Sequence, residues 1–417
     1  MKDSILLTKN YLNRYANKQH QLARIINNPD PEKGLVHTPV EIAQQPFLWR
    51  HTAHLIKEQS ANIKAFLTDA GLFSTTCRPH IVFTGAGTSD FVGQSLVDLF
   101  RSKFQTNASH WATPRITANP DDYFERNHNY ILIHFARSGN SPESKAVLNL
   151  VLSKYPDNVR HIIITCNQNG EISRIAHSHS GNVYMIVLHE DSNDKGLAMT
   201  SSFSSMVVAG QSIAHIDEMD RFLETVDRIA SAAELFIDSH TDSIYNLADP
   251  VIERAFFLGN KDLLGAATES ALKVQELTAG QLLSKNDDSM SFRHGPISAV
   301  DSSSIICFYL SEDPLTQRYE VDVIKQYEGI FHEMGAKTIV VGSNHQQLFT
   351  QTNVQYYSYD PNSKWRIEKY FQVNLAVLFA QLFGMFQAVR RGINVDDPSA
   401  HKPTYNRVVQ GVKLYDS

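Results

Sequence analysis

Residues 80–93 read "HIVFTGAGTSDFVG", and this stretch sets the pattern for the whole chain. An apolar run rich in β-branched and aromatic residues leads into Gly85, and apolar residues at helical spacing follow the glycines. The segment therefore predicts a buried strand, a glycine-rich turn and a helix. Such a turn directs backbone N–H groups and the positive end of a helix dipole at one point, which suits an anion.

The same alternation of short apolar runs and amphipathic stretches continues to about residue 190 and then restarts after a helical region at 197–240. The apolar runs lie at 130–136, 160–166 and 183–190, and again at 254–259, 304–310, 336–342 and 354–359. This pattern predicts the α/β class, with two doubly wound parallel-sheet domains in tandem, each a three-layer α/β/α sandwich, related by duplication. We expect an N-terminal helical extension over 1–70, a first domain over 71–240, and a second domain with a C-terminal tail over 241–417.

Within the N-terminal extension, "HTPVEIA" (37–43) predicts a helix start. Thr38 would cap the helix and Glu41, three residues later, would complete a capping box.

The composition excludes several classes of function. A formal net charge of −6 over 417 residues argues against a general nucleic-acid surface. Three cysteines without a C-x-x-C pair favour a reducing, cytoplasmic location, and the first residues do not resemble a signal peptide. The most apolar stretch, 373–389, is shorter than the ~20 residues a membrane span needs, so we expect a buried helix and no membrane.

Three kinds of anion site compete for the glycine loop. A phosphate-binding P-loop needs Gly-Lys-Ser/Thr, and a dinucleotide fingerprint needs a third glycine where Asp90 stands. The remaining possibility is a hydroxyl-based site in which Gly87, Thr88 and Ser89 contact the anion. The same two hydroxyls could instead serve only as helix caps.

A second loop favours the anion site. "YILIHFARSGNSPES" (130–144) ends in a turn that carries Arg137, Ser138 and Ser141. Loops that leave neighbouring parallel strands emerge at the same edge of the sheet, so the two loops should converge. A third hydroxyl cluster at 198–205 includes Thr200 and Ser201. A compact, hydroxyl-rich cradle of this kind predicts a phosphomonoester as the ligand.

In the second half, Glu269, Lys273 and Glu276 follow one another at i, i+4 and i+7, which places them on one helix face. They could form a solvated ladder of charges. They could also form a reactive group, because the helix follows directly on a strand and its start should lie at the ligand edge of that sheet. A carboxylate there could carry a proton between two carbons of a sugar. His177 and His179 have no third ligand at useful spacing, so we expect no metal and no cofactor.

"FTGAGTSDFVG", "FARSGNSPES" and "FRHGP" resemble the sugar isomerase (SIS) family, specifically chains with two SIS domains. Over roughly 40–417 the chain is most similar to the tagatose-6-phosphate ketose/aldose isomerase group, for which deamination and isomerisation of galactosamine 6-phosphate is the proposed activity. The resemblance implies that Ser89, Ser138 and Ser141 bind the phosphate. Ala136 departs from the pattern, because the broader family has serine there.

The resemblance also implies roles for the second half. Glu276 would be the proton-transfer base and Lys273 a neighbouring positive charge. We also expect Glu269, on the same helix face, to contact the substrate. His294 would assist ring opening in the active site of a neighbouring subunit, which implies a homodimer or a higher even oligomer. The chain also resembles the isomerase half of glucosamine-6-phosphate synthase. Lys402 lies near where the Schiff-base lysine of that synthase falls, but its spacing from the preceding proline differs, and its role stays open. Two alternatives remain: a non-catalytic sugar-phosphate sensor, and an isomerase of a non-amino sugar phosphate.

Overall fold

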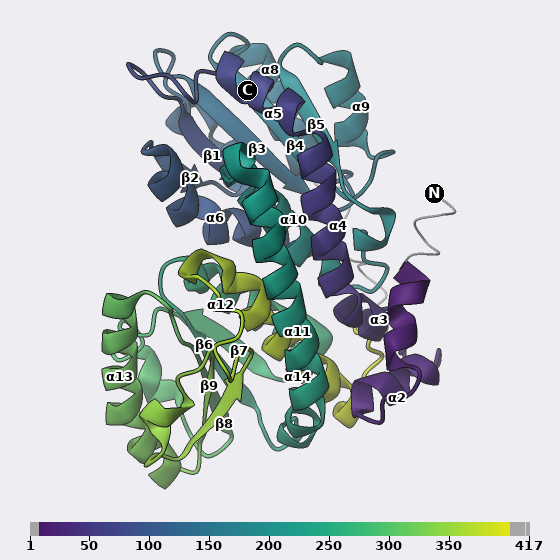
Figure 1. Cartoon of the computed structure of the whole chain (residues 1–417), viewed down its shortest axis with the longest axis vertical. Helices are drawn as coiled ribbons and strands as arrows, with labels where there is room; N and C mark the ends of the chain where they lie inside the picture. The colour runs from purple at the N-terminus through teal and green to yellow at the C-terminus, as the bar shows by residue number, and fades with distance from the viewer. Residues whose placement is uncertain (1–7, 401–412, 414–417) are drawn as a thin grey trace.

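The computed structural model describes residues 8–400 and Lys413. It contains two five-stranded sheets, ordered β2-β1-β3-β4-β5 and β10-β9-β8-β6-β7, with every strand pair parallel. Figure 1 shows the first sheet in the upper half of the molecule and the second in the lower half. The prediction of two tandem, doubly wound α/β domains is confirmed.

The strands of the first sheet are β1 His80–Thr84, β2 Ala108–His110, β3 Tyr130–Ala136, β4 Val159–Thr165 and β5 Val183–Val187. Those of the second are β6 Arg254–Leu258, β7 Leu283–Asp287, β8 Ser304–Tyr309, β9 Lys337–Gly342 and β10 Val354–Ser358. The α-helices are α2 Gln21–Asn27, α3 Thr38–Ala43, α4 Gln45–Glu58, α5 Ser60–Asp69, α6 Thr88–Phe104, α7 Thr113–Ala118, α8 Pro142–Lys154, α9 Glu171–Ser178, α10 Ser201–Ala214, α11 Met219–Leu247, α12 Asp262–Leu277, α13 Pro314–Glu333 and α14 Val373–Arg391. Short 3-10 helices are η1 Asn13–Tyr15, η2 Pro120–Asp122, η3 Glu190–Ser192, η4 Ile216–Glu218, η5 Pro296–Ala299, η6 Gln346–Phe349 and η7 Lys369–Phe371.

The two sheets repeat one design. The strand order of the second sheet matches that of the first when β6 is set on β1 and β8 on β3. The turns after β1 and β6 also share a backbone: Gly87 has φ 57° and ψ −129°, and Lys261 has φ 54° and ψ −126°. A positive φ is costly for any residue with a Cβ, so its reuse at Lys261 indicates duplication of the whole turn.

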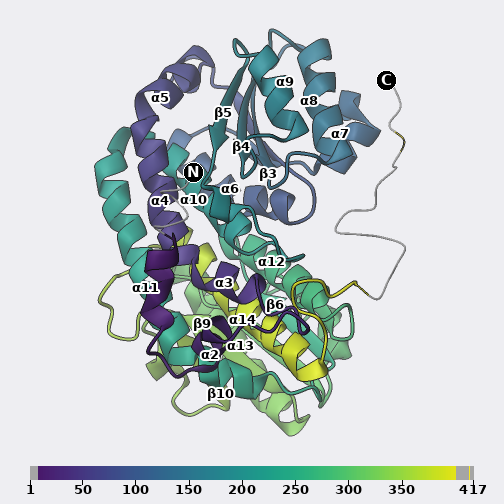
Figure 2. The same cartoon turned by 90° about the vertical axis from the view of Figure 1, so that its right-hand side faces the viewer.

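Helices cover both faces of each sheet. Figure 2 shows α7, α8 and α9 on the outer face of the first sheet, with α4 and α5 on the opposite side. The apolar faces of α8 and α13 complete separate clusters of buried side chains against the first and second sheets. The predicted boundary at 240/241 falls inside α11, which packs against α4 and α14.

The halves meet where α6 packs against α12. Gly265 on α12 permits this approach, because a Cβ there would lie 2.2 Å from Ser95 Oγ on α6. Behind α12 lies α14, whose residues 373–388 are all buried. By length and composition alone, 369–391 is the one stretch in the described ranges that could cross a membrane, and 94% of its apolar window is buried inside the fold.

The edge strands β2 and β7 were not predicted. β7 reads "LSKND" and its side chains are exposed or half-buried, so it carries no apolar run. β2 is only three residues long and also lacks an apolar run, whereas the other two edge strands, β5 and β10, carry such runs and were predicted.

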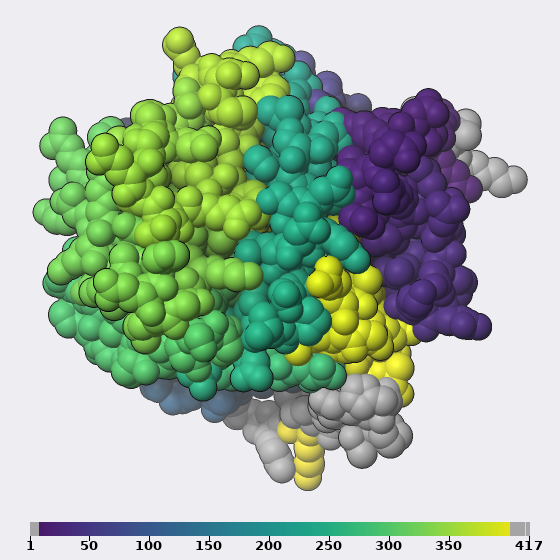
Figure 3. All heavy atoms as spheres, turned by 90° about the horizontal axis from the view of Figure 1, so that it is seen from below, coloured from purple at the N-terminus to yellow at the C-terminus, as the bar shows by residue number. Residues whose placement is uncertain are grey.

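The predicted capping box of α3 is wrong. His37 occupies the N-cap position, and Thr38 is the first helical residue with no side-chain cap bond. The free N–H groups of residues 36–38 donate instead to the carboxylate of Asp396, at 2.7–3.0 Å. Glu41 accepts from the N–H groups of Lys195 and Gly196. Contacts distant in sequence thus replace the local cap, and Figure 3 shows the purple N-terminal segment lying against a yellow part of the chain.

Candidate active site

The glycine loop after β1 has a backbone that favours glycine at two positions. Gly87 adopts a positive φ, and a Cβ at Gly85 would lie 2.5–2.6 Å from the backbone and side chain of Ser89. The loop therefore folds tightly over the start of α6, where Thr88 and Ser89 are 4% and 6% exposed. The first N–H groups of this 17-residue helix face the carboxyl edge of the sheet.

The loop after β3 emerges at the same edge. Gly139 has φ 66°, and the half-buried Ser138 accepts a hydrogen bond from Asn140 N–H at 3.3 Å. Ser141 caps α8, accepting from Ser144 N–H at 3.4 Å and donating to Glu143 at 2.8 Å.

Ala136, where the family resemblance leads us to expect a serine, ends β3 and is 5% exposed. The neighbouring guanidinium of Arg137 donates one weak bond, 3.4 Å long, to the carbonyl of Leu197. Its Nε is buried with no acceptor among the described residues, so the guanidinium keeps hydrogen-bonding capacity. Arg137 is therefore placed to supply charge beside the missing hydroxyl.

The third hydroxyl cluster is organised by an acid that the sequence analysis missed. Asp194 accepts from the N–H and hydroxyl of Thr200, from Ser201 N–H, and from both donors of Ser202. The Ser201 hydroxyl donates to the Glu41 carbonyl at 2.6 Å. In this structure the hydroxyls of Thr200 and Ser201 are fully buried and bonded within the protein. An acid six residues before a Thr-Ser-Ser helix start is the signal that could have indicated this cap.

The charged face of α12 is buried rather than solvated. Lys273 Nζ lies 2.5 Å from Glu276 Oε2, 3.5 Å from Glu269 Oε1 and 3.1 Å from the Thr88 hydroxyl of the glycine loop. The side chains of Lys273 and Glu269 are 1% and 0% exposed, whereas Glu276 is 28% exposed. Glu276 is therefore the member of the group that a ligand can reach.

Burial controls the protonation of this group. Burial raises the pKa of Glu269 to about 8, with Lys273 opposing and Glu276 reinforcing the shift. For Lys273, burial lowers the pKa, but the carboxylates of Glu269 and Glu276 more than reverse this and the net shift is upward. The ammonium therefore stays charged at neutral pH and a proton on Glu269 is favoured.

We expected the α12 group to lie at the edge of its own sheet, but the structure places it elsewhere. The group is on the C-terminal half of α12. Because α12 runs antiparallel to α6, with Gly265 beside Ser95 and Lys273 beside Thr88, this half of α12 lies next to the start of α6. The packing of the two helices thus delivers residues of the second half to the carboxyl edge of the first sheet.

His294 has no side-chain contact with this group among the described residues. His294 is exposed in the segment between β7 and η5, where its Nε2 lies 3.2 Å from Arg293 Nε. Lys402 lies outside the described residues. Among the described residues, no group of three or more His, Cys, Asp or Glu side chains could hold a metal ion.

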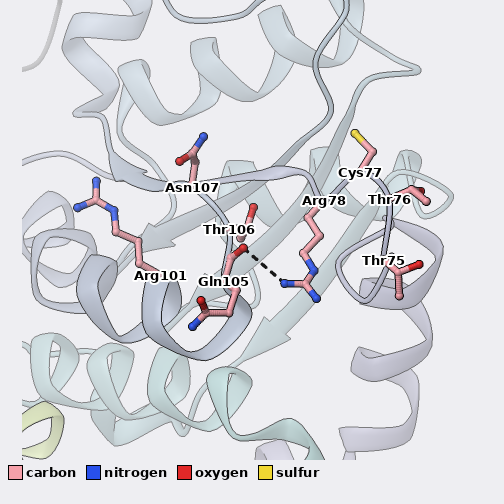
Figure 4. Close-up of a pocket in the computed structure, with 8 residues that line it drawn as sticks. All are labelled: Thr75, Thr76, Cys77, Arg78, Arg101, Gln105, Thr106 and Asn107. Carbon is pink, nitrogen blue, oxygen red and sulfur yellow. Dashed lines mark hydrogen bonds between the residues drawn. The ribbon is translucent and has the colours of Figure 1, made fainter.

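A large shallow hollow of about 670 Å³ lies at the opposite, amino edge of the first sheet (Figure 4). Its two arginines are engaged: Arg78 donates to the carbonyl of Phe104, and Arg101 donates to the carbonyl of Ala108. None of the candidate site residues that the structure describes lines this hollow.

Comparison with known proteins gives the class first. The SIS domain model matches residues 75–216, which hold both hydroxyl loops. A solved chain from Clostridium novyi NT superposes on 96% of this chain and 100% of its own length with a TM-score of 0.89, at 30% identity. Tagatose-6-phosphate ketose/aldose isomerase from Escherichia coli covers 91% of this chain and 96% of its own, with a TM-score of 0.77 and 28% identity. The chain is thus a double-SIS protein of the sugar-phosphate isomerase class.

A particular family within that class is also defined. D-galactosamine-6-phosphate deaminase AgaS of Escherichia coli O157:H7 is 32% identical over 380 residues, covering 91% of this chain and 95% of that protein. This chain belongs to the AgaS family of enzymes.

Proposed function

We propose that this enzyme converts galactosamine 6-phosphate and water to tagatose 6-phosphate and ammonia. The observation that carries the proposal is the contact between Lys273 and Thr88, which joins a buried acid–base group to a hydroxyl-rich anion loop. The printed activities of the AgaS relative and of the E. coli isomerase structure support the choice of a hexose or hexosamine 6-phosphate.

In this proposal the phosphate lies between the loops after β1 and β3. Ser89, Ser138 and Ser141 donate to it, with the helix N-termini of α6 and α8 adding their N–H groups. Arg137 compensates for the hydroxyl that Ala136 lacks. Thr200 and Ser201 support the wall of the site.

The reaction is a proton transfer followed by hydrolysis. Glu276 removes the C2 proton of the open-chain aldehyde and returns it to C1, while O1 gains a proton and the amine at C2 loses one. The result is a hydroxymethyl group at C1 and an imine at C2. Water adds to the imine, and the nitrogen leaves as ammonia. Lys273 holds Glu276 in place and stabilises negative charge that develops on the substrate oxygen. Glu269 positions Lys273 from the buried side.

The ring of the sugar must open before this transfer. We assign that step to His294, whose exposed imidazole would enter the site of a neighbouring subunit in a cytoplasmic homodimer or higher even oligomer. Two observations support this assembly and location: His294 makes no contact with the Lys273 group of its own chain in the described residues, and the three cysteines are free thiols.

The test is ammonia release. Purified enzyme should release ammonia from galactosamine 6-phosphate in step with tagatose 6-phosphate, and should be inactive on unphosphorylated galactosamine. The exposed Glu224→Gln variant, which removes a distant carboxylate, should keep full activity. Binding of the sugar phosphate without any turnover would support a sensor. Isomerisation of a non-amino hexose 6-phosphate alone would support the plain isomerase.

A further inference from the structure

Helix α13 carries most of the large apolar side chains that the described residues expose. Six such side chains are exposed, and four of them belong to α13 and its C-cap: Leu315, Tyr319, Ile330 and Met334, which are 42–63% exposed. Their spacing of four, eleven and four residues keeps them on one side of the helix, which we call the outer face of α13. Figure 1 shows α13 at the outer side of the second unit. A single exposed apolar residue is ordinary, whereas a row of them is typical of a binding surface.

The opposite side of α13 already packs on its sheet. Val321, Ile324 and Phe331 are buried in the cluster of side chains that α13 completes against β8 and β9. The outer face therefore contributes nothing to the core of a single chain. Leaving it in water forgoes the free energy that its burial would provide.

Gly329 is a second sign that another surface meets this helix. It lies inside α13, seven residues after Asp322 and on the same side, where glycine weakens a helix relative to other residues. A Cβ at Gly329 would meet no heavy atom within 4 Å, and its φ is not positive. Neither packing within the chain nor backbone conformation therefore requires glycine. The missing side chain does allow a second backbone to approach closely.

The outer face has the same pattern when it is read from either end of α13. Two apolar residues begin it and two end it, with the exposed Asp322 and Gln326 between them. Two such helices can pair antiparallel about a twofold axis near the helix centre, and each apolar end then meets an apolar end. In this arrangement Tyr319 of one copy lies over Gly329 and Ile330 of the other.

The charges along α13 fit the same arrangement. Asp322 and Lys325 flank the helix centre, and Arg318 and Glu333 lie symmetrically outside them. All four side chains are exposed, and none forms a hydrogen bond or ion pair within the part of the chain that the structure describes. In the antiparallel pair, Asp322 faces Lys325 of the second copy and Arg318 faces its Glu333. Exposed ion pairs add little affinity, but they select orientation and register.

We propose that α13 is a twofold interface at which two copies of this chain pair antiparallel along the helix. The proposal does not depend on the proposed activity, because none of the candidate catalytic or phosphate-binding residues lies on α13. A helix of 20 residues is about 30 Å long, so a contact confined to it is at the small end of specific interfaces. We therefore expect a dissociation constant on the order of 1–100 µM.

Sedimentation equilibrium over about 1–500 µM protein measures this association. At the highest concentration, Ile330→Glu should halve the mass of the wild-type assembly. Val251→Glu, at an exposed apolar residue outside α13, is the matched control and should leave the mass unchanged. A wild-type mass of one chain throughout, or an assembly that Ile330→Glu leaves intact, would overturn the interface.

Gly329→Gln separates association from folding. The added side chain should weaken pairing about tenfold, because it fills the space that the second helix needs. It should also raise the midpoint of thermal unfolding of the dissociated chain, since glutamine favours a helix more than glycine does. Unchanged pairing, or a lowered midpoint, would contradict the role given to Gly329.

A charge exchange tests the antiparallel register. Asp322→Lys and Lys325→Glu should each weaken pairing about tenfold, because each variant places like charges opposite one another twice in the contact. The double variant Asp322→Lys/Lys325→Glu should regain wild-type affinity, because opposite charges then face each other with their positions exchanged. A double variant as weak as the single ones would overturn the pairing of α13 with itself and would favour a different protein as its partner.

Discussion

The ammonium of Lys273 lies 3.1 Å from the hydroxyl of Thr88, although 185 residues separate them in the chain. Lys273 belongs to the second α/β unit and Thr88 to the first turn of α6, so this contact ties the proposed proton-transfer group to the proposed phosphate loop. A shift of α6 against α12 would alter both at once. The close packing of the two helices depends on Gly265, where a side chain would collide with Ser95.

The phosphate assignment predicts the behaviour of Ser138→Ala. Removal of one charge-assisted hydrogen bond should cost about 1–3 kcal/mol of substrate binding, so the KM should rise roughly 5- to 150-fold with a much smaller change in kcat. Steady-state kinetics with galactosamine 6-phosphate measures both. Ser153→Ala, at an exposed position on the same helix that follows the loop, is the control. A Ser138→Ala enzyme with an unchanged KM would remove this residue from the cradle.

The second unit should bind no sugar phosphate of its own. Asp262 occupies the position in the second unit that Thr88 has in the first. Asp313 caps α13 as Ser141 caps α8, and a proline follows both of these cap residues. Carboxyl groups thus replace hydroxyls, and Asp313 is already paired with Lys369 at 2.9 Å. Calorimetry with sorbitol 6-phosphate should give one site per chain. A second phosphate-dependent site that survives Ser138→Ala would contradict this.

A buried histidine pair predicts acid sensitivity. His134 and His161, on β3 and β4, share a 3.0 Å hydrogen bond. Burial lowers the pKa of His134 to about 3 and that of His161 well below its usual value. Unfolded histidine titrates near 6.5, so the unfolded chain binds more protons as the pH falls. The pair's contribution to stability is therefore complete above about pH 6.5 and is lost progressively toward pH 3.

The free energy of unfolding, measured by denaturant titration, should fall with a slope of up to about 1.4 kcal/mol per pH unit for each histidine. The double variant His134→Leu/His161→Leu should flatten that slope between pH 6 and 4. His128→Leu, which removes an exposed histidine, should leave it unchanged. An unaltered slope in the double variant would assign the acid sensitivity to other groups.

Much of the fold could be predicted from its apolar runs. The strands β1, β3 and β4 are buried almost throughout, and a strand buried on both faces requires a continuous apolar run that can be recognised in the sequence. β7 lies at an edge with its side chains half-exposed, and such a strand has no comparable pattern.

The site was predicted less completely than the fold. The spacing of Glu269, Lys273 and Glu276 placed them on one face, but spacing cannot say what that face contacts. Their position at the first sheet follows from the antiparallel packing of α6 and α12, a contact between distant segments. The role of Asp194 was missed for a different reason. Its partners lie only six to eight residues along the chain, but the hydroxyls of Thr200 and Ser201 were interpreted as contacts to a ligand and not as parts of a helix cap.

The assembly is tested by subunit exchange. Glu276→Gln and His294→Ala should each be inactive as pure homodimers. After mixing and exchange, heterodimers should regain activity, because one of the two shared sites then has both groups intact. A tag on one variant allows exchange to be measured directly. No recovery in a sample with proven heterodimers would place both groups in one subunit's site.

The last prediction concerns the base. Glu276→Gln keeps the size of the side chain and its contact with Lys273 but removes the proton acceptor, so sugar-phosphate affinity should change little while kcat falls about 10²- to 10⁴-fold. In heavy water the wild-type enzyme should place solvent deuterium at C1 of the product, because the half-exposed carboxyl can exchange its proton between the two transfers. The variant should show neither turnover nor exchange. Near-normal exchange in Glu276→Gln would move the base to another group, and Glu269, protonated near neutral pH by its burial, is the next carboxyl on that face. Lost binding together with lost turnover would instead make Glu276 a structural partner of Lys273, and the sensor alternative would then gain support.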